Sequence, residues 1–234
     1  MSILYIVATP IGNLEDITLR ALRILKEVDF ILCEDTRTTQ KLLARYEIKT
    51  PTLSYHQHSR LQKTDYIVSL LKEGKNLALV TDAGTPGISD PGGKLVETIT
   101  AELGDSVSIV PIPGPNAAVA ALSVCGFPAD EFLFLGFPPH KKGRQTFFKN
   151  LEEEAGKRTV VFYESPHRIL KSLQSLAENS PAAEIAVCRE LTKKFETTYR
   201  GTPEKVMEKL KSDKILGEFV VVVRKPQLGN SVSK

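Results

Sequence analysis

The stretch "TDAGTPGISDPGG" (residues 81–93) directly follows the apolar run "LALV" (77–80) and contains four glycines, two prolines and two aspartates. A buried strand that opens into a glycine-rich loop is typical of α/β sheets, where such loops present bare backbone to a ligand. The stretch therefore predicts a parallel sheet with a ligand-binding loop at its carboxyl edge. A tight turn with a purely structural role is the alternative.

The residues of this loop disfavour a phosphate ligand. A Walker loop requires G-x-x-x-x-G-K-[ST], but Ile88 stands where the first glycine is needed, and a leucine follows the lysine. The dinucleotide pattern G-x-G-x-x-G also fails at this loop, and Asp82 and Asp90 would repel phosphate. Carboxylates and open carbonyls instead suit a ligand with ammonium groups, hydroxyls and a positive centre.

Two further loops resemble the first. "ATPIGN" (8–13), which contains Pro10, follows a strand-like run and also pairs proline with glycine. "PIPGPN" (111–116) precedes an alanine-rich helical segment (117–122) that permits close approach of the backbone. In a doubly wound sheet, these turns meet at the carboxyl edge of the strands, where such folds bind ligands.

The remainder of the chain alternates strand-like runs with helical patterns. The strands are expected at 3–9, 30–34, 52–55, 76–81, 106–112, 132–137, 159–164, 184–191, 195–201 and 218–224. Most are unbroken apolar runs, which predicts α/β layers with sheets covered on both faces. The run at 195–201 alternates and directly follows another strand, so we expect an antiparallel hairpin in the second half.

Proline and glycine also divide the chain. The three prolines and one glycine of "PIPGPN" predict a hinge, because proline continues neither a helix nor a strand. We expect an amino-terminal domain at 1–112, a second domain at 113–226 and a flexible polar tail at 227–234.

Composition narrows the functional class. The chain has 234 residues and a formal net charge of +3, which permits an anionic partner without requiring one. Its three cysteines are far apart in the sequence, so we expect neither a disulfide framework nor a zinc site, but a reducing cytoplasm. No apolar run approaches the ~20 residues of a membrane span, and the amino terminus lacks the features of a secretion signal.

The sequence resembles a known family over nearly its whole length. The matching stretches are "YIVATPIGNLEDITLRAL", "CEDTRTTQKLL", "SYHQHS", "VTDAGTPGISDPG", "PIPGPNAAVAALSVCGF", "FLGFPP", "FYESPHRI", "CRELTKKFE" and "GEFVVVV". They are similar to the bacterial ribosomal small subunit methyltransferase I family, within the tetrapyrrole methylase superfamily. "ATPIGNLEDIT", "CEDTR" and "DAGTPGISDPG" are specific to this family.

The resemblance implies an enzyme that uses S-adenosyl-L-methionine to methylate the ribose 2′-hydroxyl of a cytidine in the decoding region of small-subunit rRNA. It also implies two α/β domains with mostly parallel sheets, and a cofactor bound in the cleft between them. The residues expected at the cofactor are Pro10, Ala83, Gly84, Thr85, Pro86, Ile88, Asp90, Pro113, Gly114, Asn116, Ala117, Phe162, Tyr163, Leu191 and Glu218. Asp90 has an alternative role as a helix cap, and the two aromatic residues have one in core packing.

Methyl transfer to a hydroxyl requires alignment of the reacting atoms and removal of a weakly acidic proton. Candidates for this chemistry are Glu34 and Asp35 in "CEDTR", and Glu190 and Lys193 in "RELTKK". The alternative role for the first pair is capping of the helix that follows. The sequence leaves the identity of the general base open.

RNA requires cations for its phosphates and flat groups for splayed bases. The residues expected to contact RNA are Arg37, His58, Lys141, Lys142, Arg144 and Arg168. His56 and His58 lie on one side of an extended stretch, but two histidines alone do not make a metal site, so no metal is expected. A solvated helix start is the alternative for the cluster of cations in "HKKGR" (140–144).

Two other functions compete with rRNA methylation: methylation of a small tetrapyrrole-like acceptor, and cofactor sensing or ribosome binding without catalysis. We also expect a homodimer, from the family and from the apolar segment 121–137. Many family members continue into a small helical region beyond the last strand. This sequence ends at Lys234, which we expect to affect RNA binding rather than the cofactor site.

Overall fold

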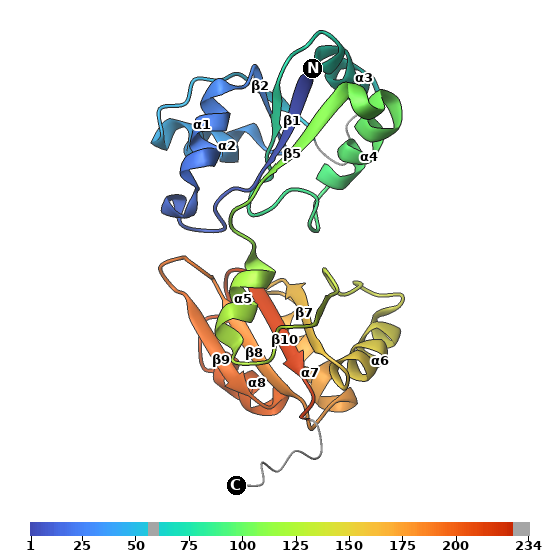
Figure 1. Ribbon diagram of the computed structural model, residues 1–234. Coiled ribbons are helices and arrows are strands. Elements are labelled where there is room, and N and C mark those ends of the chain that lie inside the picture. Colours follow the sequence, from blue (N-terminus) through green and yellow to red (C-terminus); the bar gives the residue numbers. More distant parts are fainter. Residues whose placement is uncertain (56–60, 227–234) are drawn as a thin grey trace, which may run out of the picture. The chain divides into compact units, whose positions relative to one another are not determined.

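A computed structural model of the protein describes residues 1–55 and 61–226. The chain separates into two compact units, which divide after Asn116. In the described residues each unit carries one five-stranded sheet, shown as arrows in Figure 1. All ten strands expected from the sequence are present.

The first unit contains a parallel sheet with the strand order β3-β2-β4-β1-β5. Its strands are β1 (Ser2–Val7), β2 (Phe30–Cys33), β3 (Thr52–Ser54), β4 (Leu77–Leu79) and β5 (Val107–Ile112). Its helices are η1 (Leu14–Asp16), α1 (Leu19–Glu27), α2 (Thr36–Arg45), α3 (Leu61–Lys72), α4 (Gly92–Leu103) and η2 (Gly104–Ser106).

The helices of the first unit cover both faces of the sheet, as Figure 1 shows. Thr18 begins α1 by accepting a hydrogen bond from the Ala21 N–H (3.1 Å), and Ala21, Ile24 and Leu25 then share its buried face. These side chains and those of α2 pack on one face of the sheet, and those of α3 and α4 pack on the other. Burial on both faces explains why the strands read as unbroken apolar runs.

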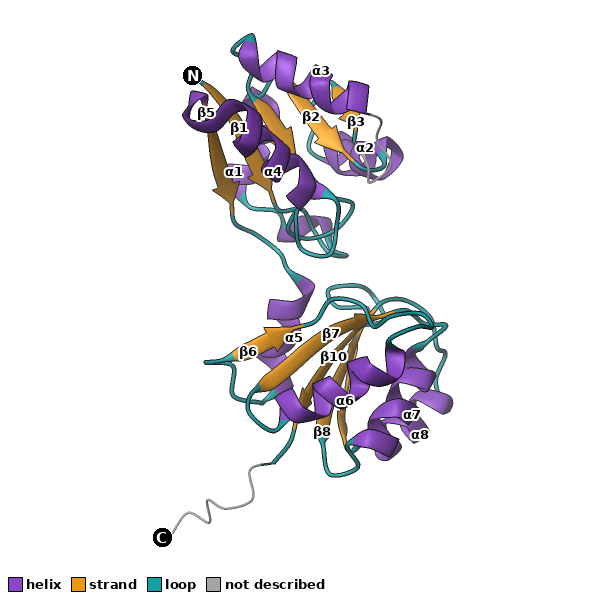
Figure 2. Ribbon diagram, turned by 90° about the vertical axis from the view of Figure 1, so that its right-hand side faces the viewer, coloured by secondary structure: helices purple, strands orange, loops and turns teal. Residues whose placement is uncertain are grey.

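The second unit contains a mixed sheet with the strand order β6-β7-β10-β8-β9. Its strands are β6 (Phe132–Phe134), β7 (Thr159–Glu164), β8 (Glu184–Arg189), β9 (Thr197–Gly201) and β10 (Phe219–Arg224). Its helices are α5 (Ala117–Cys125), α6 (Arg144–Ala155), α7 (Ile169–Asn179) and α8 (Pro203–Lys211). In Figure 2 this sheet lies between α5 and the layer formed by α6, α7 and α8.

The expectation of a mostly parallel sheet is wrong for the second unit. Only β6 and β7 pair in parallel, whereas β10 runs antiparallel to both β7 and β8, and β8 runs antiparallel to β9. The cause is the expected hairpin between β8 and β9. It reverses the chain direction, and the crossover through α8 preserves the reversed direction, so β10 enters the centre of the sheet against its neighbours.

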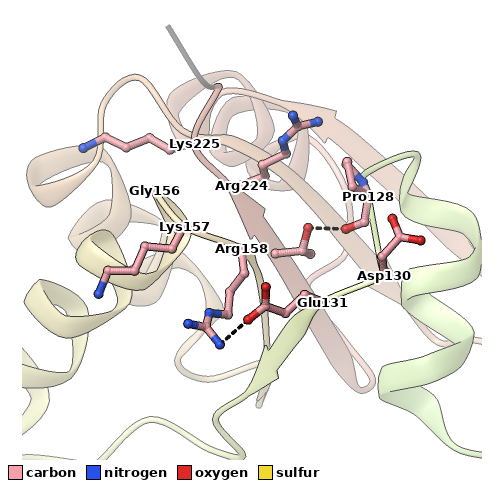
Figure 3. Close-up of a pocket in the computed structure, with 10 residues that line it drawn as sticks. Pro128, Asp130, Glu131, Gly156, Lys157, Arg158, Arg224 and Lys225 are labelled. Carbon is pink, nitrogen blue, oxygen red and sulfur yellow. Dashed lines mark hydrogen bonds and ion pairs between the residues drawn. The ribbon is translucent and has the colours of Figure 1, made fainter.

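A pocket of about 280 Å³ lies at the edge of this sheet where β7 begins and β10 ends (Figure 3). Three of its four lining cations are paired with carboxylates, because Arg158 pairs with Glu131 at 2.7 Å, Lys225 with Glu152 at 2.9 Å and Lys157 with Glu154 at 3.0 Å, which leaves Arg224. The pocket therefore offers little free charge to a ligand.

Among the described residues, no helix combines the length and the apolar character that crossing a membrane requires.

Candidate functional site

The three proline- and glycine-containing loops of the first unit meet at the carboxyl edge of its sheet. Thr9 and Gly84 exchange two backbone hydrogen bonds, with N···O distances of 2.9 and 3.1 Å. The Thr85 hydroxyl donates to the carbonyl of Pro115 at 3.0 Å. Residues 8–13, 81–91 and 113–116 are thus tied together, although they are far apart in the sequence.

Two glycines allow these loops to approach one another closely. Gly84 has a φ of +89°, a conformation that side chains with a Cβ rarely adopt. A Cβ at this position would lie 3.5 Å from the Ile11 side chain and 3.7 Å from the Pro115 carbonyl oxygen. At Gly114, a Cβ would lie only 3.0 Å from that of Ala8. The junction therefore presents backbone rather than side chains.

Asp90 fixes the shape of the long loop from within. Its carboxylate accepts hydrogen bonds from the N–H groups of Gly87 (2.8 Å) and Gly92 (2.7 Å), the second of which begins α4. This contact matches the capping alternative, so Asp90 holds the loop that was expected to bind the ligand. Ala83 and Ile88 lie exposed in the same loop, as do Pro113 and Gly114 in the third loop, whereas Pro10 and Pro86 are buried.

Glu34 joins this junction from the end of β2. Its carboxylate accepts a hydrogen bond from the Thr81 hydroxyl at 2.9 Å, and the Thr81 carbonyl accepts one from the Thr9 hydroxyl at 3.0 Å. Burial, and secondarily the nearby charges of Asp90 and Asp82, raises the pKa of Glu34, against the hydrogen bond from Thr81. A carboxylate with a raised pKa is a better proton acceptor near neutral pH.

Asp35, the neighbouring candidate, has a structural role at the start of α2. It caps α2 by accepting from the Arg37 N–H at 2.8 Å, and its carboxylate pairs with the Arg37 guanidinium at 2.7 Å. These hydrogen bonds lower the pKa of Asp35 to about 2, which makes it a weak base. Arg37 is exposed, but its charge is shared with Asp35.

Phe162 and Tyr163, both expected near the cofactor, point to opposite faces of the second sheet, as successive strand residues must. Phe162 is fully buried against Phe147 and Phe148 of α6, so its side chain is a core residue, and the expected ligand contact through its ring is wrong. Tyr163 is half-buried, and its hydroxyl accepts a hydrogen bond from the Ala118 N–H at 3.2 Å, next to Ala117 at the start of α5.

Lys193 forms ion pairs with both Glu190 and Glu218. The Lys193 ammonium lies 2.8 Å from carboxylate oxygens of both glutamates, and Glu190 also accepts from the Glu218 N–H at 3.0 Å. Burial opposes the charge of Glu190, but these contacts outweigh it and lower its pKa. Burial likewise opposes the charge of Lys193, and both glutamates outweigh it and raise its pKa. Neither group is therefore suited to accept a proton.

Backbone strain marks the same loop. Glu190 and Thr192 have φ angles of +53° and +65°, which non-glycine residues adopt at a cost. Leu191 between them is buried. Such conformations persist where surrounding contacts impose them, and they concentrate at functional sites.

The basic segment 140–144 divides into two parts. His140, Lys141 and Lys142 are exposed, as expected of residues that contact RNA. Arg144 is only 7% exposed, and its guanidinium donates to the Ser172 hydroxyl at 2.8 Å. It therefore cannot contact a phosphate in solvent.

Arg168 is also engaged within the protein. Its guanidinium lies 2.8 Å from a carboxylate oxygen of the fully buried Glu164 and donates to the Pro138 carbonyl at 2.9 Å. The sequence-based assignment of Arg144 and Arg168 to RNA is corrected on these contacts. A buried carboxylate requires charged partners, and these two arginines supply them.

His58, the remaining candidate for RNA contact, lies outside the described residues, as does the expected tail at 227–234. Within residues 1–55 and 61–226, no group of three or more histidine, cysteine, aspartate or glutamate side chains is arranged to hold a metal ion.

Comparison with known proteins identifies the family. Residues 3–206 match the model of the Tetrapyrrole (Corrin/Porphyrin) Methylases. The chain belongs to the tetrapyrrole methylase family. A cobalt precorrin-4 methyltransferase of known structure shares its fold, with a TM-score of 0.69 and 19% identity over 95% of this chain and 94% of that one.

Within the tetrapyrrole methylases, closer relatives carry one name. The ribosomal RNA small subunit methyltransferase I of Bacillus subtilis is 50% identical over 95% of this chain and 75% of its own length. The protein of the same name from Thermotoga maritima is 47% identical over 95% of this chain and 98% of its own length. These identities are far above that to the precorrin enzyme.

Two features of this tetrapyrrole methylase were missed in the sequence. Glu164 is the centre of a buried ion cluster, and Thr81 links Glu34 to the glycine-rich loop. A glutamate at the end of the apolar run "TVVFY", followed four residues later by an arginine, was a usable signal for the first. The second depends on strands adjacent only in space, and no local pattern reveals it.

The buried cluster leads to a prediction about stability. Arg144→Met keeps most of the aliphatic volume but removes the hydrogen bond to Ser172 and a cation 3.9 Å from Glu164. We expect urea unfolding to show a loss of about 2–3 kcal/mol. Lys141→Met, a matched change of an exposed cation three residues away, should stay within about 0.5 kcal/mol. Equal losses in the two variants would contradict a structural role for Arg144.

Proposed function

We propose that this tetrapyrrole methylase uses S-adenosylmethionine to methylate the ribose 2′-hydroxyl of a cytidine in the decoding region of small-subunit rRNA. The observation that carries the proposal is the junction of three glycine-containing loops, with Glu34 beside it, in a chain about 50% identical to an enzyme named for rRNA methylation. The precise nucleotide and the 2′ position rest on the family resemblance.

The residues of the junction fit S-adenosylmethionine. The ligand carries an ammonium, a sulfonium and ribose hydroxyls but no phosphate, and residues 8–13, 81–91 and 113–116 contain neither lysine nor arginine. Gly84 and Gly114 leave the backbone open, while Asp82 places negative charge nearby. This donor set favours a cation with hydroxyls over a nucleotide phosphate.

The chemistry divides between cofactor and protein. S-adenosylmethionine supplies an activated methyl group, so the protein must orient the ribose oxygen and accept its proton. We assign proton acceptance to Glu34, because its pKa is raised whereas those of Asp35 and Glu190 are lowered. Thr81 orients the Glu34 carboxylate through its hydroxyl.

The test uses small ribosomal subunits that lack the modification and S-adenosylmethionine labelled in its methyl group. We expect label in the rRNA at a single cytidine, in a form that survives alkaline hydrolysis because a 2′-O-methyl group blocks cleavage. Label on a base, on a protein or on a tetrapyrrole would assign a different acceptor. Cofactor binding without any transfer would reduce the protein to a binding module.

Two further properties belong to this proposal. The three cysteines are free and buried, which fits the reducing cytoplasm where ribosomal subunits are made.

The apolar helix α5 exposes Val119 (55%) and Val124 (43%), which supports a homodimer. Sedimentation equilibrium at micromolar concentration should give twice the monomer mass, and a monomer would remove this part of the proposal.

A further inference from the structure

An aromatic ring lies exposed where β6 leaves the second sheet. Phe137 is 53% exposed, although it follows a run of strand residues, and it lies three to five residues before the exposed side chains of His140, Lys141 and Lys142. A single exposed phenylalanine is common on protein surfaces and by itself requires no explanation. Here, however, both the ring and the backbone that carries it are held in place.

The ring of Phe137 is buttressed from one side. It meets Tyr163 edge to face, with centroids 5.4 Å apart, and Tyr163 meets Phe134 in the same way at 4.9 Å. The Tyr163 hydroxyl is fixed in turn by the Ala118 N–H. A ring that is supported on one side and more than half exposed is a preorganised surface for another flat group.

The backbone on either side of Phe137 is also fixed. The Gly136 carbonyl accepts from the Tyr163 N–H at 2.8 Å, and the Pro138 carbonyl accepts from the Arg168 guanidinium at 2.9 Å. Arg168 is anchored by the fully buried Glu164 at 2.8 Å. The buried ion cluster thus holds the segment that carries the ring, which gives that cluster a role beyond stability.

The charges of the residues that follow Phe137 in the sequence indicate what binds to this segment. Lys141 and Lys142 are exposed, and neither forms an ion pair within residues 1–55 and 61–226. S-adenosylmethionine carries no phosphate for these ammonium groups, so the cofactor's adenine is a poor match for a ring on the segment that carries them. Single-stranded RNA supplies both a stacking base and phosphates, spaced one nucleotide apart.

We propose that Phe137 stacks on an unpaired RNA base while Lys141 and Lys142 contact the adjoining phosphates. This inference rests on the proposed function and adds to it a base-stacking residue in the second unit. Stacking tolerates any base, so the platform positions the RNA strand and does not read its sequence.

The experiment measures binding of a fluorescent ten-nucleotide single-stranded RNA, and of the same RNA with one abasic nucleotide placed at successive positions. Phe137→Ala should weaken binding of the intact RNA by roughly 5- to 150-fold. One abasic position should weaken binding to the wild type by a similar factor and leave the variant unaffected. Phe137→Tyr should bind as the wild type does.

Salt dependence separates the ring from the cations. Lys141→Ala with Lys142→Ala should flatten the log–log salt slope by roughly 0.7 per lysine. Phe137→Ala should lower affinity at every salt concentration and leave the slope unchanged. Phe132→Ala is the matched control: this phenylalanine is 42% exposed at the opposite end of β6, and its loss should not change RNA binding.

Four results overturn the inference. If Phe137→Ala binds RNA as the wild type does, the ring is not a stacking residue. If Phe137→Ala instead loses affinity for S-adenosylmethionine in calorimetry, the ring belongs to the cofactor site. If Phe137→Ala becomes monomeric in sedimentation, the ring belongs to a dimer interface. If the wild type neither binds RNA nor methylates small subunits, the proposed function fails and the inference fails with it, whereas the first three results leave methylation intact.

Discussion

Gly84→Val should lower the affinity for S-adenosylmethionine by at least about a hundredfold, which corresponds to about 2.7 kcal/mol. Two effects combine at this position. Valine at a φ of +89° strains the backbone by about 1–3 kcal/mol, and its branched side chain would enter the junction beside Ile11 and Pro115. Isothermal calorimetry gives the affinity, and circular dichroism confirms that the variant is folded.

Gly74→Val is a matched control for the strain. Gly74 has nearly the same φ, +87°, but a Cβ there meets nothing within 4 Å. The control variant should lose comparable stability and keep its affinity for the cofactor. If folded Gly84→Val binds S-adenosylmethionine as tightly as Gly74→Val, the loop junction is not the cofactor site.

Glu34→Gln should slow methyl transfer to small subunits by about 10²- to 10⁴-fold, with little change in cofactor affinity. Glutamine keeps the shape and can still accept the hydrogen bond from Thr81, but it cannot take up a proton. Single-turnover transfer at saturating cofactor isolates the chemical step. Asp35→Asn is the matched control, because asparagine also caps helices and Asp35 is too weak a base to serve.

The pH dependence of transfer tests the same assignment. A general base must be deprotonated, so the rate should fall as the pH drops through the Glu34 pKa, which burial places above its ordinary value. Thr81→Val removes a hydrogen bond that lowers this pKa, so the fall in rate should begin at a higher pH. If Thr81→Val has the same pH–rate profile as the wild type, or if Glu34→Gln lowers the transfer rate by less than threefold, Glu34 is not the general base.

The loops of the first unit were predictable because their physical causes are local. A strand followed by glycine, proline and aspartate predicts a loop at the carboxyl edge, and the parallel sheet brings such loops together. The structure adds the bonds that tie the loops to one another, Thr9 to Gly84 and Thr85 to Pro115. These pairs are 75 and 30 residues apart, so no local pattern specifies them.

The errors arise from burial, which a single sequence does not display. Arg144 and Lys141 look equivalent in "HKKGR", but α6 begins at Arg144 and turns its side chain toward Ser172 and Glu164. The adjacent aromatics of "FYE" carry the same expectation of a cofactor contact, whereas strand alternation allows only one of them to face a given side. Period-two reasoning within the strand would have separated Phe162 from Tyr163.

The position of β10 imposes an order on biosynthesis. This strand occupies the centre of the second sheet, between β7 and β8, yet among the described strands it is synthesised last. The first unit is complete in sequence at Asn116 and has every strand it needs while the remainder is being translated. Until the segment Phe219–Arg224 has been synthesised, β7 and β8 lack the strand that pairs with both of them. During this time their facing edges are exposed to incorrect strand pairing.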